Sequence, residues 1–150
     1  MARELNEVGV VGLGTMGAGI TEVLARAGLS VTAVETGDEA LARGRGHIEQ
    51  STDRAVARGK LDPADRDAIF ERIRFSTSLE DLADAELVIE AIPERMELKA
   101  DVFARLDKIC PPDTILATNT SSLSVTELSV VTGRPSKVIG MHFFLSLIHI

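Results

Sequence analysis

The sequence contains no tryptophan or tyrosine, and only five of its 150 residues are phenylalanine. Its single cysteine, Cys110, excludes an internal disulfide framework, and no cysteine cluster suggests a metal site. Basic residues number 16 against 23 acidic ones, which gives a net charge of −7. Proteins that bind nucleic acid usually present a basic face, and single-strand binders stack bases on aromatic side chains. We therefore expect neither a metal nor a nucleic-acid partner.

Long apolar runs are also absent, and a bilayer span requires about 20 such residues. Glu4 and Glu7 lie where a signal peptide would have an apolar segment. Hydrophobic residues nevertheless make up 45% of the chain, which is typical of a globular protein. We expect a cytoplasmic domain with no membrane partner.

Short β-branched runs alternate with amphipathic stretches along the chain, and this alternation predicts a doubly wound, mostly parallel sheet with helices on its faces. Gly44 and Gly46 interrupt one polar helical stretch, so either another backbone approaches there or the helix is broken. Capping patterns at Thr77 with Glu80, and at Ser124 with Glu127, predict two short helices. We expect strands over 8–11, 30–34, 74–76, 86–91, 114–118 and 138–144, and longer helices over 15–27, 38–59, 62–73 and 95–109.

A glycine-rich motif follows the first predicted strand and opens the first predicted helix. It reads Gly12-Leu13-Gly14-Thr15-Met16-Gly17, a G-x-G-x-x-G pattern. The first glycine allows a tight turn, the second allows a pyrophosphate to approach the backbone, and the third lets the helix pack closely on the strand. Glu35 ends the next strand, where an acid is expected to bind the adenosine ribose. Because this acid would repel a 2′-phosphate, the sequence predicts a Rossmann-type α/β domain that binds NAD rather than NADP.

Three later segments indicate which family of NAD-binding proteins the sequence resembles. They are Ile89-Glu90-Ala91-Ile92-Pro93-Glu94, Asn119-Thr120-Ser121-Ser122-Leu123 and Gly140-Met141-His142-Phe143-Phe144. Together with the glycine motif, they resemble the 3-hydroxyacyl-CoA dehydrogenase family, and in particular its bacterial 3-hydroxybutyryl-CoA dehydrogenase branch. The resemblance implies an oxidoreductase that transfers a hydride between C3 of a 3-hydroxyacyl-CoA and NAD.

The resemblance also implies roles for individual residues near the reacting atoms. His142 would be the catalytic base that takes the hydroxyl proton, and Ser121 would hydrogen-bond the reacting oxygen beside the nicotinamide. Glu94 and Lys99 would contact the cofactor, and Asn119 would contact the substrate. An imidazole accepts protons near neutral pH, which suits the role of base.

Coenzyme A contacts are implied at Ser51 with either Arg58 or Lys60. Residues 40–60 contain five basic residues against two acidic ones, Glu49 and Asp53. Such a local excess suits the phosphates of coenzyme A, although a solvated helix face explains it equally well. The basic residues are Arg43, Arg45, Arg54, Arg58 and Lys60.

The sequence departs from the family after Phe144. The family continues with an Asn-Pro turn, a strand that supplies a glutamate to the catalytic histidine, and a helical C-terminal domain that completes the acyl pocket and forms a homodimer. Here the chain reads Leu145-Ser146-Leu147-Ile148-His149-Ile150. One back-translation of this hexapeptide is the transposase end sequence used in sequencing libraries. We therefore expect an NAD-binding domain over 1–144, a non-native tail over 145–150, and weak or no turnover.

The sequence leaves two alternative functions open. The 3-hydroxyisobutyrate and 6-phosphogluconate dehydrogenases use a similar glycine loop but rely on a lysine in their chemistry. A dinucleotide-binding module without catalysis is the second alternative.

Overall fold

The computed structural model describes residues 4–143, so Phe144 and the predicted tail over 145–150 lie outside the described residues. The order of elements follows the predicted alternation of strands and helices. The strands are β1 (Glu7–Val11), β2 (Ser30–Val34), β3 (Ile73–Ser76), β4 (Leu87–Glu90), β5 (Ile115–Thr118) and β6 (Val138–Gly140). The helices are α1 (Thr15–Arg26), α2 (Asp38–Ala57), α3 (Pro63–Glu71), α4 (Met96–Ile109) and α5 (Val125–Ser129), with 3-10 turns η1 (Leu79–Leu82) and η2 (Pro135–Lys137).

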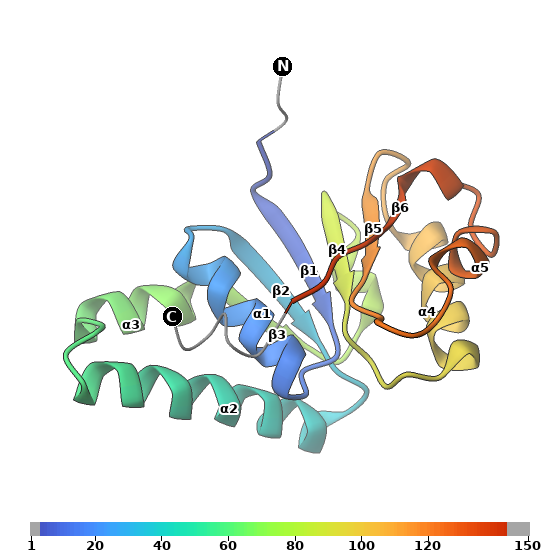
Figure 1. The fold of residues 1–150 in the computed structure, drawn as a ribbon. Coiled ribbons are helices and arrows are strands. Elements are labelled where there is room, and N and C mark those ends of the chain that lie inside the picture. The colour runs from blue at the N-terminus through green and yellow to red at the C-terminus, as the bar shows by residue number, and fades with distance from the viewer. Residues whose placement is uncertain (1–3, 144–150) are drawn as a thin grey trace.

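The six strands form one sheet in the order β3-β2-β1-β4-β5-β6, and every pairing is parallel. The order reverses between β1 and β4, so the chain winds outward in both directions from this point (Figure 1). In open parallel sheets, ligands bind at the carboxyl ends of the strands at such a switch point. The predicted doubly wound, Rossmann-type sheet is confirmed.

Helices cover both faces of the sheet, so both faces are buried. Successive residues of a strand point to opposite faces, and each strand therefore contributes to both cores. One face packs against α1, α2 and α3, and the other against η1, α4 and α5. The first core includes Val10, Ile20, Ile48, Ile69 and Ile89, and the second includes Val11, Leu82, Val88, Phe103, Leu106 and Leu128.

Helix α2 is continuous from Asp38 to Ala57, so its two glycines do not break it. A Cβ atom added at Gly44 would lie 2.4 Å from Leu13 Cβ and 2.9 Å from the Leu13 carbonyl oxygen. A Cβ atom at Gly46 would meet nothing within 4 Å. Gly44 is therefore the site of close approach, and it brings α2 against the glycine-rich loop.

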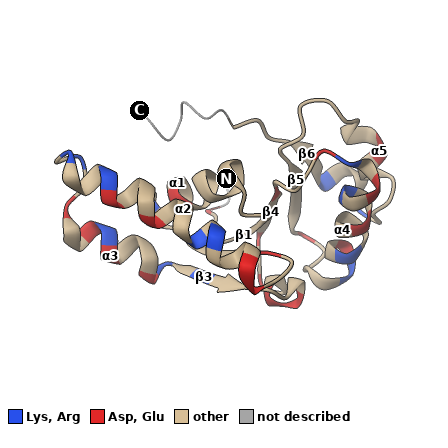
Figure 2. Ribbon diagram, turned by 90° about the horizontal axis from the view of Figure 1, so that it is seen from below, with Lys and Arg blue, Asp and Glu red and all other residues tan. Residues whose placement is uncertain are grey.

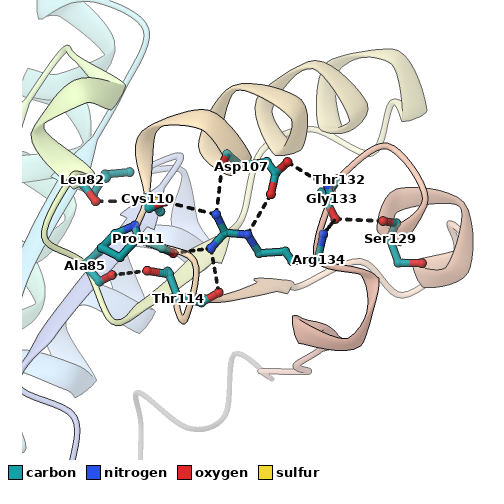
Figure 3. A network of polar contacts seen from close by, with 10 residues as sticks. All are labelled: Leu82, Ala85, Asp107, Cys110, Pro111, Thr114, Ser129, Thr132, Gly133 and Arg134. Atoms are coloured by element: carbon teal, nitrogen blue, oxygen red, sulfur yellow. Dashed lines mark hydrogen bonds and ion pairs between the residues drawn. The ribbon is translucent and has the colours of Figure 1, made fainter.

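The C-terminal end of α4 is held by one arginine from the loop before η2 (Figure 3). Arg134 donates from Nε to Asp107 Oδ1 at 2.7 Å and from Nη2 to the backbone oxygens of Asp107 and Cys110 at 2.9 and 3.1 Å. Its Nη1 donates to the oxygens of Pro111 and Thr114 at 2.5 and 3.1 Å. The guanidinium thus satisfies carbonyl groups that a helix end leaves without partners, and it ties the α5–η2 loop to α4.

Several element ends differ from the predicted ones, and three of these differences have a clear physical cause. The Thr77–Glu80 capping box does not form, because Ser78 precedes η1 and its hydroxyl donates to Glu80 Oε2 at 2.7 Å instead. The third helix ends at Glu71 because Ile73 already pairs with Val31 in the sheet. The last strand ends at Gly140, and residues 141–143 are not strand. The Ser124 cap is confirmed, since its hydroxyl accepts a bond from the Glu127 amide at 3.2 Å.

Candidate functional site

A cavity of about 560 Å³ lies at the carboxyl ends of β1, β4 and β5. It occupies the switch point of the sheet, where doubly wound folds bind their ligands. Most of the predicted cofactor residues share it. Its lining consists of Gly12, Gly14, Thr15, Met16, Glu35, Ala91, Ile92, Pro93, Glu94, Lys99, Asn119 and Ser121.

The glycine-rich loop has the backbone geometry that a phosphate cradle requires. Gly12 has φ of +93°, a left-handed conformation that glycine adopts without strain. A Cβ atom at Gly17 would lie 1.7 Å from the Gly12 oxygen, so α1 packs directly on the turn. At Gly14, by contrast, a Cβ atom would meet nothing within 4 Å. The middle glycine therefore faces open space, which leaves room for a ligand beside the backbone.

The N-terminus of α1 opens into this cavity without a side-chain cap. Its N-cap residue is Gly14, and its first turn contains no acidic residue. Because the first amide groups of a helix have no partner within the helix, they are available to an anion, and the helix dipole favours negative charge there. Leu13 does not line the cavity; it is buried beneath α2 at Gly44.

Glu35 lies just after β2, where it lines this cavity and a neighbouring one of about 600 Å³. The second cavity has apolar walls from Val11, Val34, Leu98 and Val102, and its lining also contains charged residues, namely Arg43, Glu80, Asp101 and Arg105. The two cavities share Glu35, Ile92 and Pro93, so they form one groove across the sheet edge. An apolar slot beyond an acid at the end of β2 suits an adenine ring with its ribose on the acid. The groove therefore fits a dinucleotide.

A buried polar network lies beneath the other end of the cavity. Glu90, at the end of β4, is fully buried and accepts hydrogen bonds from Thr118 Oγ1 at 2.7 Å and from the Ile92 amide at 2.7 Å. Lys99 Nζ on α4 lies 2.5 Å from Glu90 Oε2 and 3.1 Å from Glu94 Oε1. Pairing of this kind is what allows a charged lysine and glutamate to remain buried.

Glu94 joins this network to the loop after β5. Its Oε2 accepts hydrogen bonds from the hydroxyls of Thr120 and Ser122, each at 2.7 Å. Partial burial alone would raise the pKa of Glu94, but the two hydroxyls and the Lys99 ammonium outweigh it and lower the pKa from 4.5 to about 2. The Glu94 carboxylate is therefore ionised over the whole physiological range.

The segment that carries His142 runs beside the end of β5. The Met141 amide donates to the Thr118 oxygen at 2.9 Å, and the Phe143 amide donates to Asn119 Oδ1 at 3.0 Å. Asn119 thus lines the cavity and also anchors the chain on one side of His142, whose side chain is exposed. Ser121 lines the cavity two residues further along the same loop.

The predicted coenzyme A residues lie outside this cavity. Ser51 is half-buried on α2, while Arg58 and Lys60 are exposed beyond its C-terminal end. Acidic and basic residues are interspersed along α2 and α3, as Figure 2 shows. Arg45 is paired with Glu49 at 3.0 Å, and the two acids of residues 40–60, Glu49 and Asp53, both lie in ion pairs.

The sequence did not single out Glu90, Thr118, Thr120 or Ser122 as site residues. One signal was present, since Glu90 ends a strand that is otherwise apolar and buried. A charged side chain in such a place requires a partner, but the sequence does not say which. No group of three or more His, Cys, Asp or Glu side chains is arranged for a metal ion among residues 4–143. Within the same range, none of the helices has the length and apolar character needed to cross a membrane.

The sheet order, the glycine loop and the groove together define a Rossmann-type dinucleotide-binding domain. Residues 7–147 match the family described as 3-hydroxyacyl-CoA dehydrogenase, NAD binding domain, and the chain belongs to this family. The family is thus the one that the three sequence segments resemble, and not the 3-hydroxyisobutyrate and 6-phosphogluconate group.

Relatives and solved structures agree with this assignment. A 3-hydroxybutyryl-CoA dehydrogenase of Mycobacterium tuberculosis is 43% identical over 145 residues, covering 96% of this chain and 51% of the relative. The crystal structure of FadB2 from M. tuberculosis has a TM-score of 0.93 at 43% identity, covering 95% of this chain and 50% of the other. That of (S)-3-hydroxybutyryl-CoA dehydrogenase from Ralstonia eutropha has a TM-score of 0.91 at 42% identity, covering 94% and 50%. The chain spans about half the length of these relatives.

Proposed function

We propose that this chain is the NAD-binding half of a 3-hydroxyacyl-CoA dehydrogenase that acts on a short substrate such as 3-hydroxybutyryl-CoA. The observation that carries the proposal is the groove from Glu35, past the glycine loop, to Asn119 and Ser121. The names of the relatives supply the substrate class. Glu35 favours NAD over NADP, because a carboxylate on the ribose would repel a 2′-phosphate.

The proposed chemistry assigns separate tasks to the two ends of the groove. Bound NAD supplies the acceptor for the hydride that leaves C3 of the substrate. The α1 N-terminus and the loop over 12–17 hold the pyrophosphate, while Glu35 holds the adenosine ribose. His142 takes the proton of the 3-hydroxyl group, so that a 3-oxoacyl-CoA results, and Ser121 donates a hydrogen bond to the reacting oxygen.

The remaining assignments concern the substrate, the assembly and the cellular compartment. Asn119 contacts the substrate, and Ser51 with Arg58 or Lys60 contacts coenzyme A. The full-length protein forms a homodimer through its C-terminal domain. We place it in the cytoplasm, since a lone buried cysteine without disulfides is typical of a reducing compartment.

Binding and turnover are tested separately on the purified 150-residue chain. Isothermal titration calorimetry with NAD⁺ is expected to show binding at one site, and NADP⁺ is expected to bind at least about tenfold more weakly, because an unfavourable charge contact of about 1.4 kcal/mol suffices for that factor. Absence of heat with NAD⁺ would contradict the proposal.

Turnover of 3-hydroxybutyryl-CoA by the purified 150 residues is expected to be at least about 10²-fold slower than in the full-length M. tuberculosis relative, because these residues cover only about half of that relative's length and the family resemblance places the glutamate partner of the histidine in the other part. As a substrate control, the full-length relative is assayed with 3-hydroxybutyryl-CoA and with the free 3-hydroxy acid. Faster turnover of the CoA thioester is expected. A rate for the 150-residue chain equal to that of the relative would contradict this part of the proposal.

A further inference from the structure

The cavity is lined by one cationic side chain, and its ammonium protons are all within hydrogen-bond distance of acceptors in the protein. Among the described residues that line the cavity, Lys99 is the only lysine or arginine. Its ammonium group has three protons and three acceptors within the protein: Glu90 Oε2 at 2.5 Å, Glu94 Oε1 at 3.1 Å and the Ile92 oxygen at 3.1 Å. Within the protein, Lys99 therefore holds both carboxylates of the network in place.

The charges of this network do not cancel. Lys99 contributes one positive charge, while Glu90 and Glu94 contribute one negative charge each, so the cluster carries a net charge of −1. Glu90 is fully buried beneath the cavity, whereas the Glu94 side chain is 43% exposed and lines it. The uncompensated charge is therefore the one that faces the cavity.

The position of Glu94 determines which part of a dinucleotide would meet this charge. Glu94 follows β4 and is hydrogen-bonded to the loop after β5, whereas Glu35 follows β2 on the other side of the switch point. In doubly wound sheets the adenosine lies over the β1–β3 half and the nicotinamide over the other half. Glu94 thus lies at the redox end.

We propose that Glu94 biases this site toward the oxidised form of the dinucleotide. The inference rests on the proposed function, because it requires NAD to bind in the groove. The oxidised nicotinamide ring carries a positive charge and the reduced ring is neutral, so a fixed negative charge beside the ring stabilises the oxidised form selectively. Charges at the adenosine end act equally on both forms.

The structure also keeps this charge in place. The hydroxyls of Thr120 and Ser122 both donate to Glu94 Oε2, and Lys99 holds Oε1, so the carboxylate has a defined orientation. A preorganised charge of this kind discriminates between ligand forms without having to rearrange on binding. The low pKa of Glu94 is consistent with the same arrangement.

The test compares the affinities of both dinucleotide forms in matched variants. Dissociation constants for NAD⁺ and NADH are measured by calorimetry in one buffer at about pH 8. In Glu94→Gln, which preserves the shape and an acceptor for the hydroxyls, the ratio Kd(NAD⁺)/Kd(NADH) is expected to rise about threefold to tenfold. In the unmodified chain the same ratio is expected to rise with salt, because salt screens a partly exposed charge.

Two control variants isolate the effect. Glu35→Gln alters the adenosine end and is expected to weaken both forms without changing their ratio. Glu71→Gln removes an exposed carboxylate at the opposite, amino-terminal edge of the sheet and is expected to change neither constant. An unchanged ratio in Glu94→Gln, with binding intact, contradicts this inference alone. Absence of binding by the unmodified chain contradicts the proposed function and this inference with it.

Discussion

At the scale of single residues, the three glycines of the loop have different neighbours and so different roles. Gly14→Ala places a methyl group where the protein has no atom within 4 Å, on a backbone that alanine also adopts. We expect unchanged thermal stability, measured by circular dichroism, and at least tenfold weaker NAD⁺ binding, because about 1.4 kcal/mol of lost phosphate contact suffices.

The contrasting variant is Gly17→Ala. Its Cβ atom would lie 1.7 Å from the Gly12 oxygen, so α1 must move away from the turn. The free energy of unfolding is expected to fall by about 2–3 kcal/mol, as for other overpacked sites. Equal stability losses in Gly14→Ala and Gly17→Ala would contradict the assignment of the middle glycine to the ligand.

A second prediction concerns the titration of Glu94. Its pKa is lowered in the folded chain to about 2, so the ionised form stabilises the fold above the ordinary value of 4.5, and this contribution is lost as pH falls toward 2. Carboxyl NMR is expected to show Glu94 still ionised at about pH 3. Thr120→Val with Ser122→Ala removes two donors and is expected to raise the pKa. Titration near 4.5 in the unmodified chain would contradict the network.

The position of a site residue was predictable from the sequence where its neighbours in space are also close to it in the chain. The glycine loop and Glu35 follow strands at fixed spacing, so their common placement on the groove follows from the βαβ unit alone. The bond between Glu90 and Lys99 was not predictable, because it joins β4 to the interior face of α4. Likewise, Asn119 was expected to touch substrate, yet its Oδ1 also accepts from the Phe143 amide, a contact between segments that the sequence does not relate.

At the scale of elements, α2 offers a matched pair of substitutions. Gly46→Ala adds a methyl group with nothing within 4 Å in the middle of a helix, so it is expected to stabilise the chain by up to about 1 kcal/mol. Gly44→Ala is expected to destabilise it by about 1–3 kcal/mol, because the methyl group would meet Leu13. Urea denaturation measures both. Similar stabilisation by the two substitutions would show that α2 does not pack on the loop.

The C-terminal end of α4 supplies another prediction. Arg134→Met removes the guanidinium donors to the helix-end carbonyls and to Asp107 Oδ1, and leaves Asp107 Oδ2 with the Gly133 amide. The pKa of Asp107 is lowered by the Gly133 amide and by Arg134 against the opposing effect of burial. We expect a loss of about 3–5 kcal/mol in the free energy of unfolding by urea, the usual cost of breaking a buried pair on one side. Arg105→Met is the control, because it removes a surface pair with Asp101 at 4.0 Å and an exposed attraction to Glu80. It is expected to change the free energy of unfolding by less than about 0.5 kcal/mol. Equal effects would contradict the role of Arg134.

Element types were predictable from periodicity, whereas element ends were decided by contacts in the sheet. Ile73 continues the apolar pattern of α3, but its pairing with Val31 places it in β3. The apolar run from Val138 predicts a strand to Phe144, yet β6 pairs with β5 only as far as Gly140. In both cases pairing with the neighbouring strand determines where the element begins or ends, and the sequence of the segment alone does not show this pairing.

At the scale of the whole molecule, the proposed ligand spans both halves of the sheet and should stabilise the fold as a unit. NAD⁺ at one hundred times its Kd is expected to raise the free energy of unfolding by about 2.7 kcal/mol. Differential scanning fluorimetry should then show an increase in Tm of several degrees, and a smaller increase with NADP⁺ at the same concentration. No increase with NAD⁺ would contradict binding to the folded chain.

The overall architecture was predictable because its signals are redundant. Six apolar runs separated by amphipathic stretches admit few arrangements, since parallel neighbours need crossovers and crossovers are right-handed. Val10 belongs to one core and Val11 to the other, so a single short apolar run already indicates a strand that is buried on both faces.

The close approach of Gly44 to Leu13 joins α2 directly to the glycine-rich loop. Leu13 belongs to the phosphate loop, and Gly44 belongs to the long helix that leads to Ser51 and Arg58. Because a side chain at position 44 would collide with Leu13, α2 and the loop fit together at one fixed separation. Any substitution that pushes α2 outward at this point would also disturb the backbone that receives the pyrophosphate.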